Sequence, residues 1–169
     1  MMIYLGENDV IDHTWADKTW LICDLDGTLC NTEHRDQFAR ERNWDEFNGR
    51  LHLDEPNQPV LDFVRLFRTT NSNHRVMALT ARNSSMLGPT SDWMMKHSCL
   101  HLFDVIRMRP AHNKSESDAD LKPRLLFNFF LNKETALKKV FLILDDRDRV
   151  VKSFREHGFP VWQVKEGAY

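Results

Sequence analysis

Two acidic residues stand one residue apart where an apolar segment meets a glycine turn, in the sequence Trp20-Leu-Ile-Cys-Asp24-Leu-Asp26-Gly-Thr-Leu. Two like charges at the end of a buried strand are unfavourable unless a cation or a difference in protonation offsets them. An Asx turn with two incidental acids leaves that repulsion unexplained. The spacing therefore favours one carboxylate as a nucleophile that faces a cleft and the other as an acid that protonates a leaving group.

A second acidic pair ends another apolar segment, in the sequence Leu142-Ile-Leu-Asp145-Asp146-Arg147. If both segments are strands of one sheet, their carboxylates can converge at the mouth of that sheet. A set of ligands made only of oxygen atoms suits Mg²⁺, and a metal there removes the repulsion. We therefore expect a Mg²⁺ site among four carboxylates, those of Asp24, Asp26, Asp145 and Asp146.

Two further segments contain groups that could bind phosphate oxygens. Thr80 and Arg82 follow an apolar segment, although a threonine at a strand end is more often a helix cap. Lys122 follows Asp118 at the start of a predicted helix, where the macrodipole disfavours a cation. In isolation a solvated lysine is the commoner interpretation, but beside a phosphate Lys122 would neutralise charge on the transferring group.

Apolar and amphipathic segments alternate along the chain. The patterns predict strands over residues 20–24, 75–79, 103–108, 140–144 and 161–164, and helices over 59–67, 121–131 and 150–157. This order indicates an α/β fold with a mostly parallel central sheet, in which ligands bind beyond the carboxyl ends of the strands. Residues 30–58 are weakly periodic and are predicted to form a small helical insertion over the site, and residues 111–120 to form a mobile loop.

Composition limits the classes of function. With 169 residues, 41% of them hydrophobic, the chain can bury the core of one domain. A net charge of -2 excludes the overall basic field of a nonspecific nucleic-acid coat protein, so any contact with a polynucleotide must be local. Three cysteines without a CxxC spacing and the lack of a long apolar run predict a soluble, cytoplasmic protein with no membrane contact.

Taken in order, the segments Asp24-x-Asp26-Gly-Thr, Thr80, Lys122 and Asp145-Asp146 resemble the four motifs of the haloacid dehalogenase (HAD) superfamily of phosphotransferases. More narrowly, residues 145–167 resemble the 3′-phosphatase domain of phage polynucleotide kinase-phosphatases, with Asp-Asp-Arg, two variable positions, Val-Val and later Trp-Gln-Val. The resemblance implies a HAD-like Rossmannoid three-layer sandwich. It also implies one phosphatase domain over residues 1–169, a cap-like insertion at about 30–58, and the host cytoplasm as location if the protein is of phage origin.

The resemblance also implies roles for individual residues. Asp24 would accept the phosphoryl group, while Asp26 would act as general acid and then activate water. Mg²⁺ would be held by Asp24, the backbone carbonyl of Asp26, and Asp145 or Asp146. Nonbridging phosphate oxygens would be bound by Thr80 and Lys122. Four more residues match groups of the substrate pocket in those enzymes, namely Arg35, Arg82, Arg109 and Asp118.

Three functions remain open from the sequence. The leading hypothesis is a polynucleotide 3′-phosphatase in nucleic-acid end repair, and the alternative is a nucleotidase or general phosphatase acting on free nucleotides. A catalytically inactive module that binds phosphorylated ends is the third, which the presence of both Asp24 and Asp26 disfavours. The chain has no GxxxxGK[ST] motif, so we expect no kinase domain in it and a separate kinase or ligase as a partner.

Two other groups of residues are given a structural interpretation. His97, Cys99 and His101 could bind zinc, but without a second ligand cluster they more plausibly mark a helix end and a buried thiol. Trp44 and Trp93 could stack on a nucleobase, or they could pack the insertion onto the core.

Overall fold

The computed structural model describes residues 3–4, 6–10, 15, 17–113 and 115–167. Its main element is a six-stranded parallel sheet in the order β1-β6-β5-β2-β7-β8. The strands are β1 (Ile3–Tyr4), β2 (Thr19–Cys23), β5 (His74–Asn83), β6 (Val105–Arg109), β7 (Val140–Arg147) and β8 (Val161–Gly167). The predicted α/β fold with a parallel sheet is therefore confirmed.

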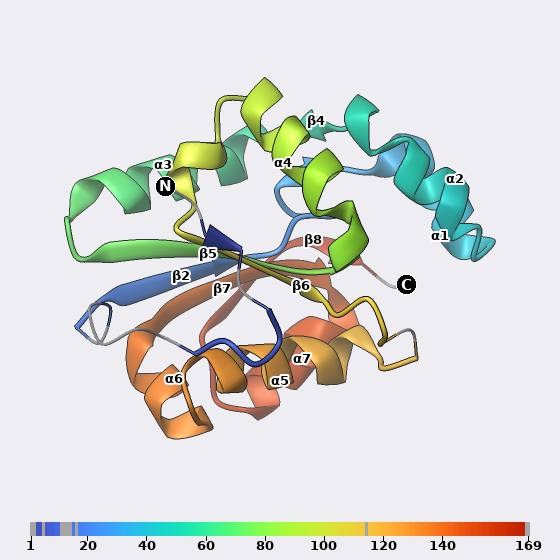
Figure 1. Cartoon of the computed structure of the whole chain (residues 1–169). Coiled ribbons are helices and arrows are strands. Elements are labelled where there is room, and N and C mark those ends of the chain that lie inside the picture. The colour runs from blue at the N-terminus through green and yellow to red at the C-terminus, as the bar shows by residue number, and fades with distance from the viewer. Residues whose placement is uncertain (1–2, 5, 11–14, 16, 114, 168–169) are drawn as a thin grey trace.

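Helices cover both faces of the sheet, which makes three layers (Figure 1). One face packs against α3 (Gln58–Thr70) and α4 (Leu87–Lys96), and the other against α5 (Asp118–Phe129), α6 (Lys133–Lys139) and α7 (Asp148–Glu156). Successive side chains of a strand point to opposite faces. In β2, Leu21 and Cys23 accordingly join the first core, and Trp20 and Ile22 join the second.

A small insertion follows the loop after β2. Strands β3 (Cys30–Asn31) and β4 (Glu55–Pro56) pair antiparallel, and helices α1 (Asp36–Arg40) and α2 (Trp44–Gly49) lie between them in the chain. Both helices are too short to be stable alone, so they depend on tertiary contacts. They lie beyond one end of the sheet (Figure 1). The helical insertion expected after the first predicted strand is present.

Some elements differ from the predictions in length. Strands β5 and β7 continue through polar residues, so Thr80 and Asp145 lie within strands and not after them. Helix α5 begins at Asp118, because the Ser117 side chain accepts a hydrogen bond from the amide of Asp120 and caps it. The predicted start near residue 121 is wrong by one turn. The loop predicted over 111–120 therefore ends at residue 117, and residue 114 of that loop lies outside the described residues.

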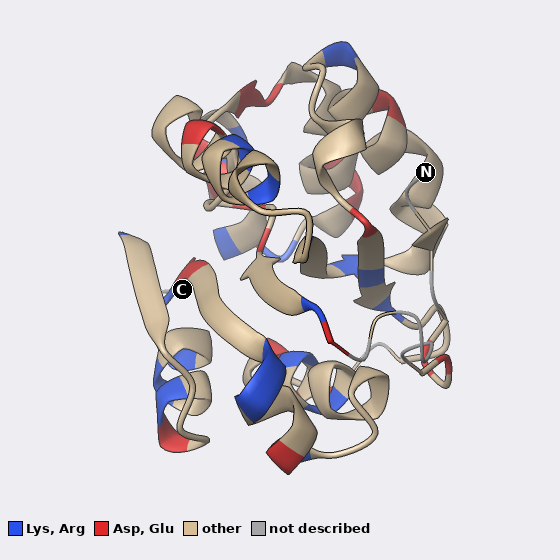
Figure 2. Cartoon of the chain, turned by 90° about the vertical axis from the view of Figure 1, so that its left-hand side faces the viewer, with Lys and Arg blue, Asp and Glu red and all other residues tan. Residues whose placement is uncertain are grey.

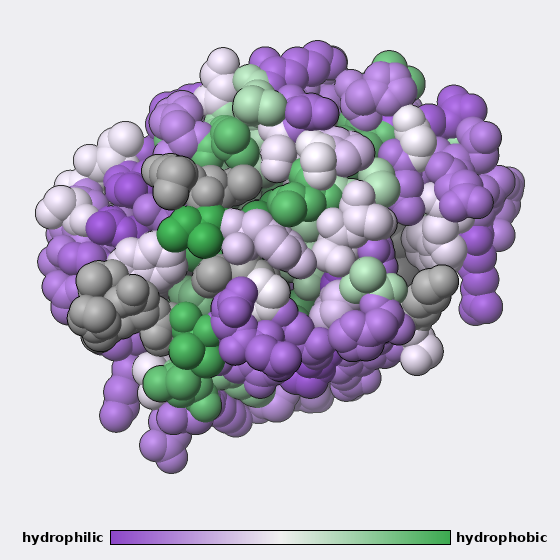
Figure 3. Space-filling model, in the orientation of Figure 1, coloured by the Kyte–Doolittle hydropathy of each residue, from purple (hydrophilic) through white to green (hydrophobic). Residues whose placement is uncertain are grey.

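The surface is mixed in charge and mostly polar. Figure 3 shows hydrophilic residues over most of one face, with hydrophobic residues in smaller patches near its middle. Figure 2 shows Lys and Arg interspersed with Asp and Glu on another side. In the described part of the chain, no helix has the length and apolar character needed to cross a membrane.

Candidate active site

Three carboxylates meet where β2 and β7 end side by side. Cys23 of β2 pairs with Leu144 of β7, and the amide of Asp24 donates to the Leu144 carbonyl at 3.0 Å, which places Asp24 beside Asp145. Ligand oxygens of Asp24, Asp145 and Asp146 all lie within 4.8 Å of one another, and the three residues are buried. The carboxyl ends of parallel strands thus bring Asp24 to the pair Asp145 and Asp146, about 120 residues away in the sequence. The Asp26 carboxylate, expected as a fourth member, is not part of this group and contacts two arginines instead.

Lys122 connects two of these carboxylates. Its Nζ lies 2.8 Å from Asp24 Oδ1 and 2.6 Å from Asp145 Oδ2. Burial raises the pKa of Asp24 to about 7, with the Lys122 charge opposing this shift and the Asp145 charge adding to it. For Lys122, burial favours the neutral amine, but Asp145 and Asp24 outweigh it and hold the pKa of Lys122 above its ordinary value. Because α5 begins at Asp118, Lys122 lies in the second turn of the helix. The helix macrodipole acts mainly within the first turn, so it does not disfavour a lysine at this position, contrary to the expectation from the sequence.

The glycine turn after Asp26 fits closely against Asp146. Gly27 has φ of +83°, and a Cβ atom built there would lie 2.2 Å from Asp146 Oδ2. The Thr28 hydroxyl donates to Asp146 Oδ1 at 3.2 Å. Burial and the neighbouring charge of Asp145 raise the pKa of Asp146 to about 6. Glycine is therefore required here both by the backbone angle and by the space that the carboxylate occupies.

This arrangement fits a divalent cation. Asp24, Asp145 and Asp146 contribute three negative charges and Lys122 one positive charge, which leaves two negative charges when all are ionised. Carboxylate oxygens are the ligands that Mg²⁺ prefers, and Mg²⁺ has the charge that such a group needs. The residues present therefore suit that ion.

Asp26 contacts two arginines. Arg82 donates to Asp26 through Nε at 2.9 Å and Nη2 at 2.6 Å, and Arg35 donates through Nη2 at 2.5 Å. Burial would raise the pKa of Asp26, but the charges of Arg82 and Arg35 outweigh burial and hold the pKa well below its ordinary value. The side chain of Asp26 remains 17% exposed, in contrast to the arginines, which are almost fully buried. Both arginines therefore lie deeper in the protein than Asp26, on the side of it away from solvent.

Asp54 completes this network and was missed by sequence reasoning as a site residue. It is fully buried, it accepts hydrogen bonds from Arg35 Nε at 2.6 Å and from Arg35 Nη2, and His34 Nε2 lies 2.9 Å from it. The indole of Trp93 donates to the Asp54 backbone carbonyl at 2.8 Å. Asp54 is one of several acids in a weakly periodic segment, so only its contact with Arg35 identifies it.

The remaining predicted site residues flank the cluster. Thr80 lies two residues beyond Ala78, which pairs with Cys23, so it is beside the loop that follows β2. Its hydroxyl accepts from the amide of Arg82 at 3.2 Å. On the α5 side, Arg109 Nη2 donates to Asp118 Oδ1 at 2.6 Å. Strand tips, the N-terminal half of α5 and, for Arg35, the insertion therefore bring the predicted site residues to one end of the sheet.

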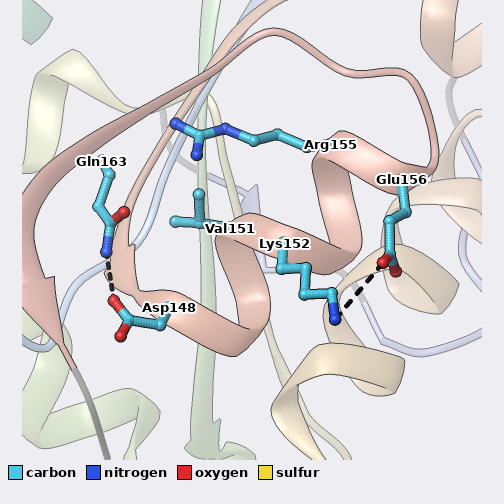
Figure 4. Close-up of a pocket in the computed structure, with 6 residues that line it drawn as sticks. All are labelled: Asp148, Val151, Lys152, Arg155, Glu156 and Gln163. Atoms are coloured by element: carbon cyan, nitrogen blue, oxygen red, sulfur yellow. Dashed lines mark hydrogen bonds and ion pairs between the residues drawn. The ribbon is translucent and has the colours of Figure 1, made fainter.

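Two hollows lie near this end of the molecule. A hollow of about 260 Å³ adjoins the glycine turn and is lined by Gly27, Asn31, Glu33, Pro56, Asn57, Gln58 and Lys165. A second, of about 400 Å³, lies between α7 and β8 (Figure 4). There Lys152 pairs with Glu156 at 3.8 Å, and Gln163 donates to Asp148 at 2.6 Å. Since the groups of the second hollow mostly satisfy one another, we assign it no catalytic role.

The other residues that the sequence singled out have structural surroundings. Cys99 is a buried thiol just after α4, as predicted, and donates to the Met94 carbonyl at 3.4 Å. Trp93 is buried and joins α4 to the insertion through Asp54. Trp44 is 52% exposed on α2, with its ring against Phe47. Packing therefore explains Trp93, whereas Trp44 faces solvent.

Comparison with solved structures gives two relatives of the same kind. A chain of the Pnkp1/Rnl/Hen1 complex is 28% identical over 90% of this chain, with a TM-score of 0.70. A chain of the Pnkp1/Rnl/Hen1 RNA repair complex is 27% identical over 96% of this chain, with a TM-score of 0.72. In both cases this chain spans 47% of the length of the relative.

More distant structures share the fold. A haloacid dehalogenase-like hydrolase from Streptococcus pneumoniae is 14% identical, with a TM-score of 0.61 over 90% of this chain and 89% of its own. Among curated proteins, none matches the chain significantly. The family model of the polynucleotide kinase PNKP phosphatase domain matches residues 18–169, a range that includes every residue of the site. The chain therefore belongs to the PNKP phosphatase family, within the HAD superfamily.

Proposed function

We propose that this chain is a Mg²⁺-dependent phosphomonoesterase that forms an aspartyl phosphate on Asp24 and removes the 3′-phosphate from polynucleotide ends. The observation that supports this most is the buried group of Asp24, Asp145 and Asp146, with the Lys122 ammonium between two of them. A net negative set of oxygen ligands beside a lysine suits a divalent cation and a phosphate together. Membership of a HAD phosphatase family supports the class of reaction.

The first step transfers the phosphoryl group to the enzyme. An oxygen of the Asp24 carboxylate attacks phosphorus, and the bond between phosphorus and the leaving oxygen breaks. Asp26 donates a proton to that oxygen, so the product leaves as an alcohol. In the free protein Arg82 and Arg35 hold the pKa of Asp26 well below its ordinary value, so this role requires the negative charge of the bound phosphate to raise that pKa. Lys122 and Thr80 bind the nonbridging oxygens, and Lys122 offsets the charge that gathers on them.

The second step regenerates Asp24. Asp26, now ionised, takes a proton from a water molecule whose oxygen attacks phosphorus. The bond between phosphorus and the Asp24 oxygen breaks, and inorganic phosphate leaves. Mg²⁺ would be held by Asp24, the backbone carbonyl of Asp26, and Asp145 or Asp146. When bound, Mg²⁺ polarises the phosphoryl oxygens and neutralises the repulsion between nucleophile and substrate.

Arg35 and Arg82 have a defined place in this scheme. Both guanidiniums contact Asp26, so they orient the residue that transfers protons. A phosphate dianion bound beside Asp26 competes for the same donors, and we propose that it shares the two arginines with Asp26. Arg109 and Asp118 then line the α5 side of the substrate pocket.

The class of substrate is supported by the family and by its relatives. The family model describes the phosphatase domain of a polynucleotide kinase, and one of the solved relatives belongs to the Pnkp1/Rnl/Hen1 RNA repair complex. Since this chain spans about half of those relatives, only the phosphatase reaction is proposed for it, with a separate kinase or ligase as a partner in repair. The 3′-phosphate of a nucleic-acid end is the substrate that such a domain would remove.

The test is Mg²⁺-dependent phosphate release from a 3′-phosphorylated oligonucleotide, compared with 3′- and 5′-mononucleotides. We expect a higher kcat/KM for the oligonucleotide, no release in EDTA, and none from the Asp24→Asn variant. Equal or better turnover of mononucleotides would assign the protein to nucleotide metabolism. If the wild type releases no phosphate from any substrate but still binds phosphorylated ends, a binding module replaces the proposed enzyme.

A further inference from the structure

Three arginines gather around Asp118, on the α5 and α7 side of the site. This one carboxylate lies within hydrogen-bond reach of three arginines, Arg109, Arg147 and Arg149. Glu116, two residues before Asp118, pairs with Arg124 and is a second negative charge in this region. Burial lowers the pKa of Arg109, and the neighbouring guanidiniums of Arg124 and Arg149 lower it further, while Glu116 opposes them. Arginines are therefore concentrated here although the chain as a whole has a net charge of -2.

The arginines around Asp118 differ in how firmly they are held. Arg109 donates to Asp118 at 2.6 Å and also to the backbone carbonyls of Ala81 at 3.2 Å and Glu116 at 2.8 Å. These contacts fix Arg109 as part of the structure. The Arg149 side chain is 54% exposed, and its hydrogen bond to Asp118 is at the limit of 3.5 Å. Arg149 therefore has a guanidinium that can turn towards an anion from solvent.

The arginine cluster adjoins the catalytic carboxylates. The amide of Arg147 donates to Asp145 Oδ1 at 3.0 Å, which places the start of α7 directly beside the carboxylate group. Asp118 precedes Lys122 by four residues of α5, or about 6 Å along the helix axis. Lys122 in turn contacts Asp24, the proposed nucleophile. Asp118, around which the arginines gather, therefore lies about one helical turn of α5 from Lys122.

We propose that Arg149, supported by Arg147, forms a second anion site that binds the phosphodiester next to the terminal 3′-phosphate of a polynucleotide. This proposal rests on the proposed function and deepens it, because it names the contact that separates a polynucleotide end from a mononucleotide. A guanidinium binds phosphate oxygens with two parallel hydrogen bonds, which suits a phosphodiester. A nucleoside 3′-monophosphate has no second phosphate and leaves the site empty.

The same helix offers a matched control. Arg155 lies six residues after Arg149 on α7, about 9 Å further along the axis and away from the strand tips. It lines the hollow of Figure 4 and donates to the Val161 carbonyl at 3.3 Å. Arg149→Gln and Arg155→Gln therefore make the same chemical change, at the same helix, near to and far from the carboxylates.

The experiment measures kcat/KM for three substrates at several salt concentrations. These are a 3′-phosphorylated oligonucleotide, a nucleoside 3′,5′-bisphosphate and a nucleoside 3′-monophosphate. We expect Arg149→Gln to lower kcat/KM about tenfold for the first two, since a hydrogen bond to a charged group is lost, and to leave the monophosphate unchanged. The slope of log kcat/KM against log salt for the oligonucleotide should become shallower by about 0.7. Arg155→Gln should match the wild type throughout.

Three outcomes would overturn the inference. An equal loss for all three substrates would mean that Arg149 acts through Asp118 on the reacting group. A loss confined to the oligonucleotide would contradict binding of the adjacent phosphodiester, and no loss at all would contradict any contact. Failure of the proposed function is visible in the wild type itself, as no preference for the oligonucleotide. If only this inference fails, the wild type prefers the oligonucleotide and the Arg149→Gln variant keeps that preference.

Discussion

Asp54 gives the insertion a direct contact with the catalytic groups. Two carboxylates, Asp26 and Asp54, and two guanidiniums, Arg35 and Arg82, form one buried network with no net charge. Arg35 divides its donors between the two acids, so its hold on Asp26 depends on Asp54. The guanidinium also lies 4.0 Å above the ring of Phe47 in α2, which fixes its plane. We infer that Asp54 positions Asp26 through Arg35.

The first prediction concerns the Asp54→Asn variant. The amide of the asparagine cannot accept both hydrogen bonds from Arg35. Arg35 would then donate mainly to Asp26 and hold the Asp26 carboxylate more tightly in its ionised form. We expect kcat for phosphate release to fall at least tenfold, with a smaller change in KM. Asp104→Asn is the control, because Asp104 also accepts from an arginine, Arg68, at 3.0 Å, but at the opposite end of the sheet. If both variants lose activity in proportion to their loss of thermal stability, Asp54 has only a structural role.

The second prediction concerns Lys122→Met. Lys122 supplies the positive charge that contacts Asp24 and Asp145, and removing one partner of a buried ion pair costs about 3 to 5 kcal/mol. The metal-free variant should therefore melt below the wild type. Mg²⁺ should raise its melting temperature more than it raises that of the wild type, since the ion then takes over the charge of the lysine.

Calorimetry in EDTA and in Mg²⁺ measures both effects. Lys138→Met is the control, because Lys138 is exposed at the end of α6 and should leave both melting temperatures unchanged. A Lys122→Met protein that responds to Mg²⁺ no more than the wild type would contradict a metal site at these carboxylates.

At the scale of the elements, the sequence predicts which residues a parallel sheet brings together at one edge. Asp24 and Asp145 follow apolar residues on neighbouring strands, and in a parallel sheet such positions meet at one edge. The ends of β5 and β7 were predicted too early, because polar residues interrupt the apolar pattern while the backbone pairing continues. Asp54 could not be predicted as a site residue, since its contact with Arg35 joins two parts of an insertion without a regular period.

The third prediction tests the glycine turn between β2 and the insertion. Gly27→Ala places a methyl group in a left-handed backbone conformation, which costs about 1 to 2 kcal/mol, and against Asp146 Oδ2 at 2.2 Å. Asp146 must move, so we expect both a lower melting temperature and a weaker response to Mg²⁺. Gly88→Ala is the control, because nothing lies within 4 Å of its Cβ position in α4, and alanine should slightly stabilise that helix. A normal Mg²⁺ response in Gly27→Ala would contradict a role for Asp146 in metal binding.

At the scale of the whole molecule, charge is balanced overall and uneven locally. The net charge is -2, and basic and acidic segments alternate on the side seen in Figure 2. Attraction to a long duplex depends on many phosphate contacts, each of which releases counterions. In this chain three arginines instead gather around Asp118, beside the catalytic carboxylates. Such a distribution favours binding at a nucleic-acid terminus over binding along a duplex.

The last prediction follows from that distribution. Turnover of a 3′-phosphorylated oligonucleotide should be unaffected by an excess of covalently closed circular DNA, which has phosphates but no ends. The same DNA, nicked to create 3′-phosphate ends, should compete in proportion to the concentration of ends. Measuring the initial rate at equal total phosphate separates the two cases, because only the ends differ. If the closed circle inhibits as strongly as the nicked one, the protein binds the nucleic-acid backbone along its length. Local charge would then not explain recognition of the terminus.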